Sequence, residues 1–203
     1  MMRSRSIIVG LSLVCSLVGA GCTNRARGSD AFYAEAARTD PRRHPYVIGV
    51  ADVVRITVWK DPNLSTDASV RPDGTMTMPL AGEFAAAGHT AAELQKEIAK
   101  RLENYVKDAV VTVAVVEVNS YRFTVAGNVE HPGMFTSRYY VTFSEALALA
   151  GGPNRYASTS NMTLVRTAGP RPQRVSIDYD AILSGDRPDE DVVVLAGDAI
   201  QVP

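Results

Sequence analysis

The sequence contains few of the residues on which metal, redox and nucleophile chemistry depend. Among its 203 residues are 2 cysteines, 3 histidines and 1 tryptophan. Cys15 lies within an N-terminal apolar stretch, so Cys22 has no disulfide partner once that stretch is removed. His44, His89 and His131 are scattered and have no ligand at zinc-like spacing beside them. The sequence therefore predicts neither a disulfide framework, nor a zinc site, nor a cysteine–histidine nucleophile.

Other catalytic and nucleic-acid-binding signals are missing as well. There is no Gly-x-Ser-x-Gly elbow and no phosphate-cradling glycine loop. The formal net charge is −1 and no basic stripe is present, which argues against a nucleic-acid partner. One acidic loop has two interpretations, a calcium site or, as we favour, a solvated acidic turn. It contains Asp186, Asp189, Glu190 and Asp191. We expect a protein that is not an enzyme and has no cofactor and no metal.

The long apolar run of the chain is confined to its N-terminus. Arg3 and Arg5 precede the apolar stretch from Ile7 to Ala20, and small residues lead directly to Cys22. This pattern predicts a signal peptide at residues 1–21 and lipidation of Cys22, although Gly19 stands where leucine is usual. Plain secretory cleavage and an uncleaved inner-membrane anchor are the alternatives. The run is short for a membrane span, which needs about 20 residues.

Residues 22–44 are interpreted as a lipidated tether. Ala31–Arg38 fits a short helix, which Pro41 and Pro45 bound. The basic cluster Arg42-Arg43-His44 is either a solvated linker, which we favour, or a contact with lipid headgroups or a neighbouring subunit.

The stretch from Tyr46 to Leu80 is typical of strands. Val54, Ile56 and Val58 alternate with polar residues, as in a strand with one buried face. Pro72-Asp73-Gly74 is a turn sequence, and we expect it to join strands 69–71 and 75–80 as a hairpin. Whether Trp59 is buried or exposed stays open, because it alternates with Val58.

A helix and a strand complete the first predicted domain. Thr90 and Glu93 form a capping box, and Leu94, Ile98 and Leu102 give the helix one apolar face against the sheet. The β-branched run 109–118 predicts a strand buried on both faces in the middle of a sheet. We place a domain boundary after residue 118.

The second predicted domain, residues 119–203, repeats this combination of strands and one capped helix. Thr142 and Glu145 start the helix, and Gly151-Gly152 ends it. Strands are expected at 121–126, 162–166, 174–178 and in the last twelve residues. The predicted fold class is therefore α+β, with two small β-rich domains that each carry one capped helix.

The residues of both domains resemble a known family, the outer-membrane polysaccharide export proteins. In the first domain the matching positions are Tyr46, Ile48, Gly49, Asp52, Arg55, Ile56, Val58, Trp59, Val70-Arg71-Pro72-Asp73-Gly74 and Met78-Pro79-Leu80. Ala51 replaces the second glycine of the family's Gly-x-Gly-Asp-like turn. In the second domain they are Gly127, Val129, Pro132, Gly133, Phe135, Ala150-Gly151-Gly152, Gly197, Asp198, Ile200, Val202 and Pro203. The resemblance implies a polysaccharide export domain at 45–118 and a soluble-ligand-binding β-grasp domain at 119–203, with these motif residues in structural roles.

The resemblance also implies a function. It suggests a homo-oligomeric ring at the periplasmic face of the outer membrane that carries capsular polysaccharide or exopolysaccharide. Longer members end in an outer-membrane helix, whereas the given sequence ends at Pro203 after a strand. We therefore expect the protein to act together with a separate outer-membrane β-barrel and an inner-membrane copolymerase. The alternative is a monomeric lipid-anchored carbohydrate-binding or regulatory lipoprotein, and an envelope hydrolase is the weakest interpretation. Sugar sites often contain exposed aromatics, and the aromatics that this chain offers for such a role are Trp59, Tyr139 and Tyr140.

Overall fold

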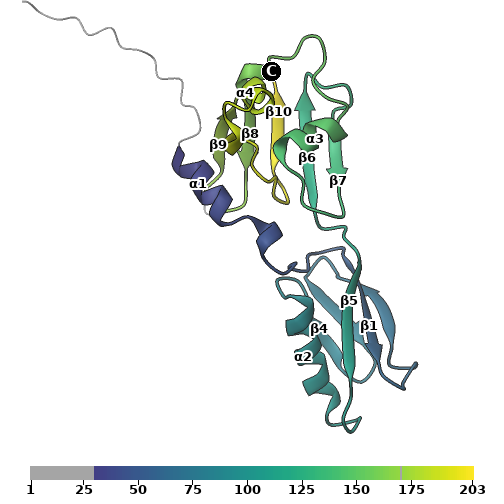
Figure 1. The fold of residues 1–203 in the computed structure, drawn as a ribbon. Helices are drawn as coiled ribbons and strands as arrows, with labels where there is room; N and C mark the ends of the chain where they lie inside the picture. Colours follow the sequence, from purple (N-terminus) through teal and green to yellow (C-terminus); the bar gives the residue numbers. More distant parts are fainter. Residues whose placement is uncertain (1–29, 170) are drawn as a thin grey trace, which may run out of the picture.

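The computed structural model describes residues 30–169 and 171–203, which form two β-rich units (Figure 1). The predicted α+β class with two such units is confirmed. The predicted signal peptide and the lipidation site at Cys22 lie outside the described residues. Within residues 30–169 and 171–203, no helix combines the length and the apolarity needed to cross a membrane.

The first unit consists of a three-stranded antiparallel sheet, a two-stranded hairpin and one helix. The order in the sheet is β2-β1-β5, so β1 is central. The elements are β1 (Val53–Val58), β2 (Thr66–Ser69), β3 (Thr75–Met78), β4 (Gly82–Ala85), α2 (Ala91–Leu102) and β5 (Val111–Glu117). Helix α2 begins at the predicted capping box, in which Glu93 N donates to Thr90 Oγ1 over 3.3 Å and Thr90 N donates to Glu93 Oε2 over 2.8 Å. Its Leu94, Ile98 and Leu102 are fully buried, as their spacing predicts.

The predicted hairpin around Pro72-Asp73-Gly74 is wrong in its strand pairing. The turn itself exists, because Gly74 N donates to Arg71 O over 2.9 Å and Gly74 has φ +82°. However, β2 pairs with β1, while β3 pairs with β4 through a second tight turn at Pro79 and Leu80. A turn sequence fixes the local reversal but does not select the partners of the strands beyond it.

The prediction that 109–118 is a central strand buried on both faces is also wrong. Strand β5 is an edge strand that pairs with β1 alone. Val111 and Val113 are buried, whereas Val110 and Val116 are 60% and 39% exposed. The reason is that α2 covers one face of the sheet and nothing within the described residues covers the other face.

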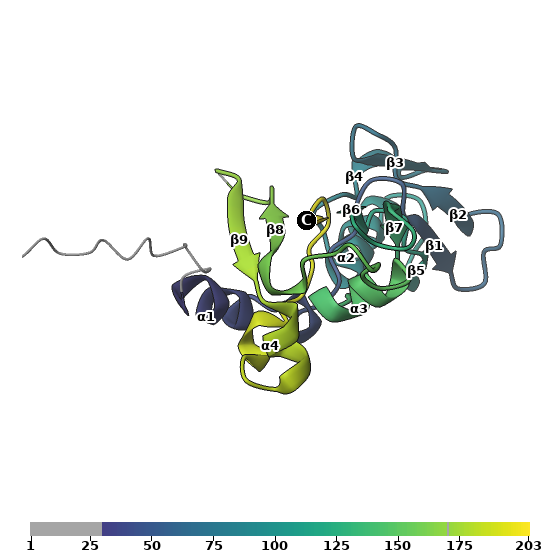
Figure 2. The same cartoon turned by 90° about the horizontal axis from the view of Figure 1, so that it is seen from above.

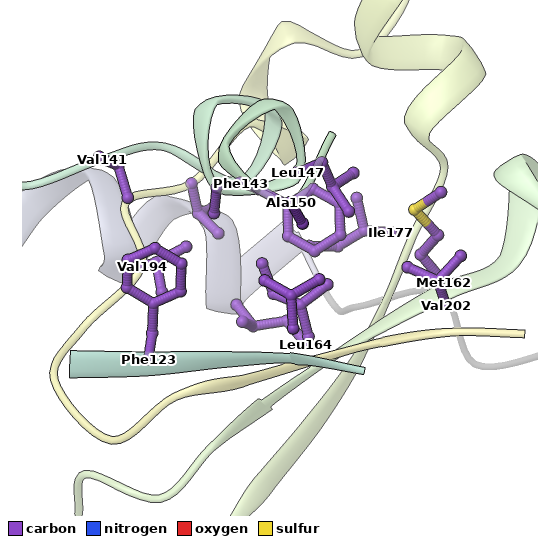
Figure 3. Packing of buried hydrophobic residues seen from close by; sticks show 14 of the residues in the cluster. Phe123, Val141, Phe143, Leu147, Ala150, Met162, Leu164, Ile177, Val194 and Val202 are labelled. Carbon is purple, nitrogen blue, oxygen red and sulfur yellow. The ribbon is translucent and has the colours of Figure 1, made fainter. Parts of the chain in front are cut away.

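The second unit is a five-stranded mixed sheet with helices packed on it. The strand order is β7-β6-β10-β8-β9, and the last strand, β10, runs parallel to β6 and antiparallel to β8. The elements are β6 (Arg122–Gly127), β7 (Gly133–Thr136), α3 (Phe143–Leu149), β8 (Met162–Arg166), β9 (Gln173–Ile177), α4 (Tyr179–Ser184) and β10 (Ala199–Val202), with 3-10 turns η2 (Thr159–Asn161) and η3 (Pro188–Glu190). Figure 3 shows Phe143 and Leu147 of α3 facing Phe123 and Leu164 of the sheet.

Helix α4 adds to the single capped helix predicted for this domain. Asp178 caps it by accepting a hydrogen bond from Ala181 N over 3.1 Å, and Gly185 ends it in the left-handed conformation. With six residues, it is too short for a hydrophobic period to be recognised in the sequence.

The first described helix, α1 (Asp30–Arg38), packs against the second unit although it precedes the first unit in the chain (Figure 2). Tyr33 is 3% exposed, and its hydroxyl donates to Ser176 O of β9 over 3.0 Å. Phe32 and Ala36 pack against the same core. The chain then passes through η1 (Pro41–Arg43) into the first unit. Residues 30–38 of the predicted tether are therefore part of a packed structure.

Candidate functional site at the domain junction

The junction between the units is built around the carboxylate of Asp52, which is fully buried. It lies directly before β1 and accepts hydrogen bonds from both sides of the junction. Within the first unit, the donors are Tyr46 OH at 2.6 Å and Gly49 N at 2.8 Å. From the segment that enters the second unit, they are Asn119 N at 2.8 Å, Ser120 N at 2.7 Å and Ser120 Oγ at 3.1 Å. This carboxylate therefore holds the chain segments that cross between the units.

The approach of the two segments is close enough to require a glycine. A Cβ atom at position 49 would lie 2.3 Å from Ser120 Cβ, which is far inside contact distance. Burial, followed by the hydrogen bond to Asp52, raises the pKa of Tyr46 well above its usual range. The Tyr46 hydroxyl therefore remains a donor at physiological pH, and its ring is fixed beside the junction.

A groove with a volume of about 530 Å³ lies at this junction and opens to solvent. A volume of about 300 to 1,000 Å³ is usual for ligand sites in proteins. Its walls come from η1, from the edge strand β5 and from the segment after β7. They contain three basic side chains, three tyrosines and no acidic residue. The lining residues are Pro41, Arg42, His44, Tyr46, Val115, Val118, Arg138, Tyr139 and Tyr140. We call this the junction groove.

The tyrosines of the junction groove continue into the core of the second unit. The Tyr140 ring lies 6.3 Å from that of Tyr46 and 5.0 Å, edge-on, from that of Tyr121. The Tyr121 hydroxyl donates to Val194 O over 2.9 Å and accepts from Val141 N over 3.1 Å. These two hydrogen bonds fix the orientation of the hydroxyl. Burial raises the pKa of Tyr121 to about 12. Tyr139, in contrast, is 65% exposed at the rim.

The basic side chains of the junction groove differ in their ion pairs. Arg42 is bidentate on Asp40, with Nη2 at 2.8 Å from Oδ2 and Nε at 3.0 Å from Oδ1. This hydrogen bonding holds the pKa of the Asp40 carboxyl below its usual range. Arg138 is exposed, and within residues 30–169 and 171–203 no carboxylate forms an ion pair with it. Arg138 is thus an exposed guanidinium of the groove without an ion pair among these residues, in contrast to the paired Arg42.

Comparison with known families gives the assignment of both units. Residues 40–116 match the family model described as polysaccharide biosynthesis/export protein, and residues 122–175 match the SLBB domain. The chain belongs to the polysaccharide export protein family. This is a family of export proteins and not of enzymes.

Curated relatives of this export family member come from two bacterial genera. The EPS I polysaccharide export outer membrane protein EpsA of Ralstonia solanacearum is 32% identical over 134 residues, 54% of this chain and 36% of the relative. Its counterpart in Ralstonia nicotianae is 28% identical over 182 residues, 78% of this chain and 47% of the relative. The exopolysaccharide production protein ExoF of Rhizobium meliloti is 27% identical over 164 residues, 75% of this chain and 35% of the relative. The chain thus spans less than half the length of each of these relatives.

The motif residues of the polysaccharide export family lie in two kinds of place. Tyr46, Gly49 and Asp52 come together at the junction described above. The turn Arg71-Pro72-Asp73-Gly74 lies elsewhere in the first unit. There, Asp73 Oδ1 accepts from Thr75 N over 2.9 Å, and Arg71 pairs with Glu83 over 2.8 Å. Trp59 is 69% exposed and does not line the junction groove.

The motif residues of the second unit have local contacts that shape its backbone. A Cβ at Gly127 would lie 1.9 Å from Val202 O of the neighbouring strand. Gly151 and Gly152 end the α3 segment with φ +81° and +84°. Pro132 and Gly133 lead into β7.

Gly197 and Asp198 form the turn before β10. Asp198 is fully buried and pairs with Arg166 over 2.9 Å, while Asp198 Oδ2 also accepts from Leu195 N over 2.8 Å. Burial raises the pKa of Asp198 despite this pairing. These contacts link the ends of β8 and β10.

The acidic loop is not simply a solvated turn, because some of its carboxylates are buried or bonded to the backbone. Glu190 is 1% exposed and accepts from Asp178 N over 2.7 Å, and Asp191 accepts from Ser144 N over 2.9 Å. Asp189 pairs with Arg187. In the described part of the chain, no group of histidine, cysteine, aspartate and glutamate residues is placed to hold a metal ion.

The junction groove contains two of the three aromatics that the sequence offers for contact with sugar. Tyr139 and Tyr140 line it, whereas Trp59 does not. Arg138, Val118 and the supporting Tyr121 were missed. The signal available was the Arg138-Tyr139-Tyr140 sequence itself, in which a cation adjoins two aromatics.

Proposed function

We propose that this chain is an envelope protein that takes part in the export of an exopolysaccharide or capsular polysaccharide. The observation that supports the proposal most directly is the succession of an export domain match and an SLBB match in one chain. The names of the relatives support the same role, since all refer to exopolysaccharide or its export. The outer membrane in the names of the EpsA proteins supports a location at the periplasmic face of that membrane.

In this proposal the chain acts as a subunit of a homo-oligomeric conduit. An outer-membrane β-barrel and an inner-membrane copolymerase complete the path of the polymer. Lipidated Cys22 anchors the chain without a spanning segment, because several acyl chains hold a protein to a membrane firmly. Closed rings are a common outcome when one surface of a protomer contacts a different surface of the next.

Removal of the gene tests the export role. Deletion should strongly lower the secreted or surface-bound polymer, and supplying the intact chain should restore it, as expected if the chain is required for transport. Unchanged polymer in the deletion strain would contradict the export role.

The ring and the anchor have separate tests. Native mass spectrometry of the detergent-extracted protein should give a multiple of the protomer mass, whereas a monomer would favour the alternative of a lipid-anchored binding or regulatory lipoprotein. Cys22→Ala should abolish fatty-acyl labelling and membrane retention. Cys15→Ala, within the same N-terminal stretch, is the matched control and should leave labelling intact.

A further inference from the structure

We propose that the junction groove binds carboxylate-bearing sugar units of the exported polymer. This inference rests on the proposed export function and adds to it a site and a chemical class of substrate. Three features of the groove carry it: an exposed aromatic ring, a guanidinium without an ion pair among residues 30–169 and 171–203, and walls without acidic side chains.

The aromatic ring supplies contact area for a sugar. A pyranose ring has one face of C–H groups, which carry partial positive charge, and a tyrosine ring has a negatively polarised face. Tyr139 is 65% exposed, and its partly buried neighbour Tyr140 lines the same groove. Exposed aromatic rings that gather in a hollow are typical of recognition surfaces rather than of solvated ones.

The guanidinium supplies charge recognition. Arginine binds a carboxylate through two parallel N–H···O bonds, which are stronger than neutral hydrogen bonds. The charge of Arg42 is paired with Asp40, whereas Arg138 next to Tyr139 has no such partner within residues 30–169 and 171–203. With His44 as the other basic group of the lining and no carboxylate there, the groove favours an anionic ligand over a neutral one.

The support beneath the groove makes it a preformed site. Tyr46 is fixed by Asp52 and Ser120, and the rings of Tyr140 and Tyr121 pack in sequence behind it. A ligand therefore does not have to order these side chains when it binds, which lowers the entropic cost of binding. An open groove also admits an internal segment of a chain molecule, as a polymer in transit requires.

The test is binding of defined oligosaccharides to the processed protein extracted from membranes, measured by calorimetry in detergent. The probe is a hexamer of galacturonic acid, and its fully methyl-esterified form is the matched neutral probe. The intact chain should bind the acid form more tightly than the ester by at least about tenfold, since the ester lacks the charge that Arg138 pairs with. Tyr139→Ala and Arg138→Gln should each weaken binding of the acid form by about tenfold or more.

Matched control variants keep the result specific. Tyr156→Ala removes a tyrosine that is 68% exposed but lies outside the junction groove, and Arg174→Gln removes an exposed arginine of β9. Both should bind the acid hexamer as the intact chain does. Tyr139 and Arg138 are exposed, so their variants should keep the midpoint of thermal unfolding, which shows that lost binding is not lost folding.

Several outcomes would overturn the inference. They are equal binding of acid and ester, no binding of either probe, or equal weakening by the control variants. Binding of polyglutamate as strong as that of the acid hexamer would indicate a general polyanion site. Loss of binding to phosphatidylglycerol vesicles in the groove variants, without sugar binding, would assign the groove to lipid headgroups. If deletion of the gene still stops export in any of these cases, the proposed function stands and only the groove assignment fails.

Discussion

Asp52 shows how one side chain can decide the geometry of a junction. Its carboxylate accepts hydrogen bonds from donors that lie 67 and 68 residues away in the sequence. It also accepts a hydrogen bond from the nearby Tyr46 hydroxyl. Without Asp52 those donors would be buried and unpaired, and each unsatisfied donor costs more than a typical hydrogen bond contributes.

Asp52→Ala should therefore destabilise the chain strongly. We expect a loss of roughly 3 kcal/mol in the free energy of unfolding, measured by urea denaturation. Asp67→Ala is the matched control, because Asp67 forms an exposed pair with Arg55, and such pairs contribute little. Equal effects of the two substitutions would show that the Asp52 contacts are not a structural determinant.

Tyr121 gives a prediction about alkaline pH. Its pKa is raised to about 12 in the folded chain from an ordinary value of about 10. The protonated hydroxyl thus stabilises the folded state below pH 10, and this contribution is lost as pH rises through about 12. Urea denaturation at pH 9 and pH 11 should show a decrease in stability that is smaller in Tyr121→Phe. Tyr156→Phe, at an exposed position, should behave as the intact chain, and an unchanged decrease in Tyr121→Phe would contradict the assignment.

At the scale of elements, local rules predicted more than pairing rules did. Both capping boxes, Thr90 with Glu93 and Thr142 with Glu145, start helices as expected, because their contacts span only three residues. The exposed face of β5 was not predictable from its β-branched run, since exposure depends on which face α2 covers. The pairing of the strands on either side of the Pro72–Gly74 turn was also not predictable, because it depends on the tertiary arrangement of β1 and β4.

The site was predictable to a comparable degree. The residues Tyr46, Gly49 and Asp52 were recognised as a motif, but their contacts with Asn119 and Ser120 depend on the fold and have no signal in the sequence. The position of Tyr33 in the core of the second unit is another contact of this kind, across 143 residues to Ser176.

Helix α1 can be tested through the link that follows it. Tyr33→Ala should release α1 from the second unit and loosen the backbone around three already exposed arginines at the end of α1 and in η1, which are Arg38, Arg42 and Arg43. Trypsin cleavage there should rise by at least about threefold, because local opening governs proteolysis of segments with few buried contacts. Tyr105→Ala, at a position that is 63% exposed in the first unit, should leave the cleavage rate unchanged. Equal rates for the two variants would contradict the packing of α1.

At the scale of the whole molecule, the close approach of Gly49 and Ser120 sets how the two units meet. Gly49→Ala places a methyl group 2.3 Å from Ser120 Cβ, so the two segments must move apart. We expect a lower midpoint of thermal unfolding and a changed radius of gyration in solution scattering, because the shift occurs between the units.

The double variant Gly49→Ala, Ser120→Gly provides the control for this prediction. Removing the Ser120 side chain removes the clash, so part of the lost stability should return even though the hydrogen bond of Ser120 Oγ to Asp52 is lost. Strictly additive destabilisation by the two substitutions would show that the contact does not limit the junction.

The early position of α1 in the chain has a mechanical consequence. The first unit is in effect an insertion between one helix of the second unit and the remainder of that unit. A pull on the N-terminal end is therefore borne by β9 and its neighbours before any force reaches the first sheet. A fragment that started at residue 119 would lack Phe32, Tyr33 and Ala36. The apolar surface of the second unit against which they pack would then be exposed to water.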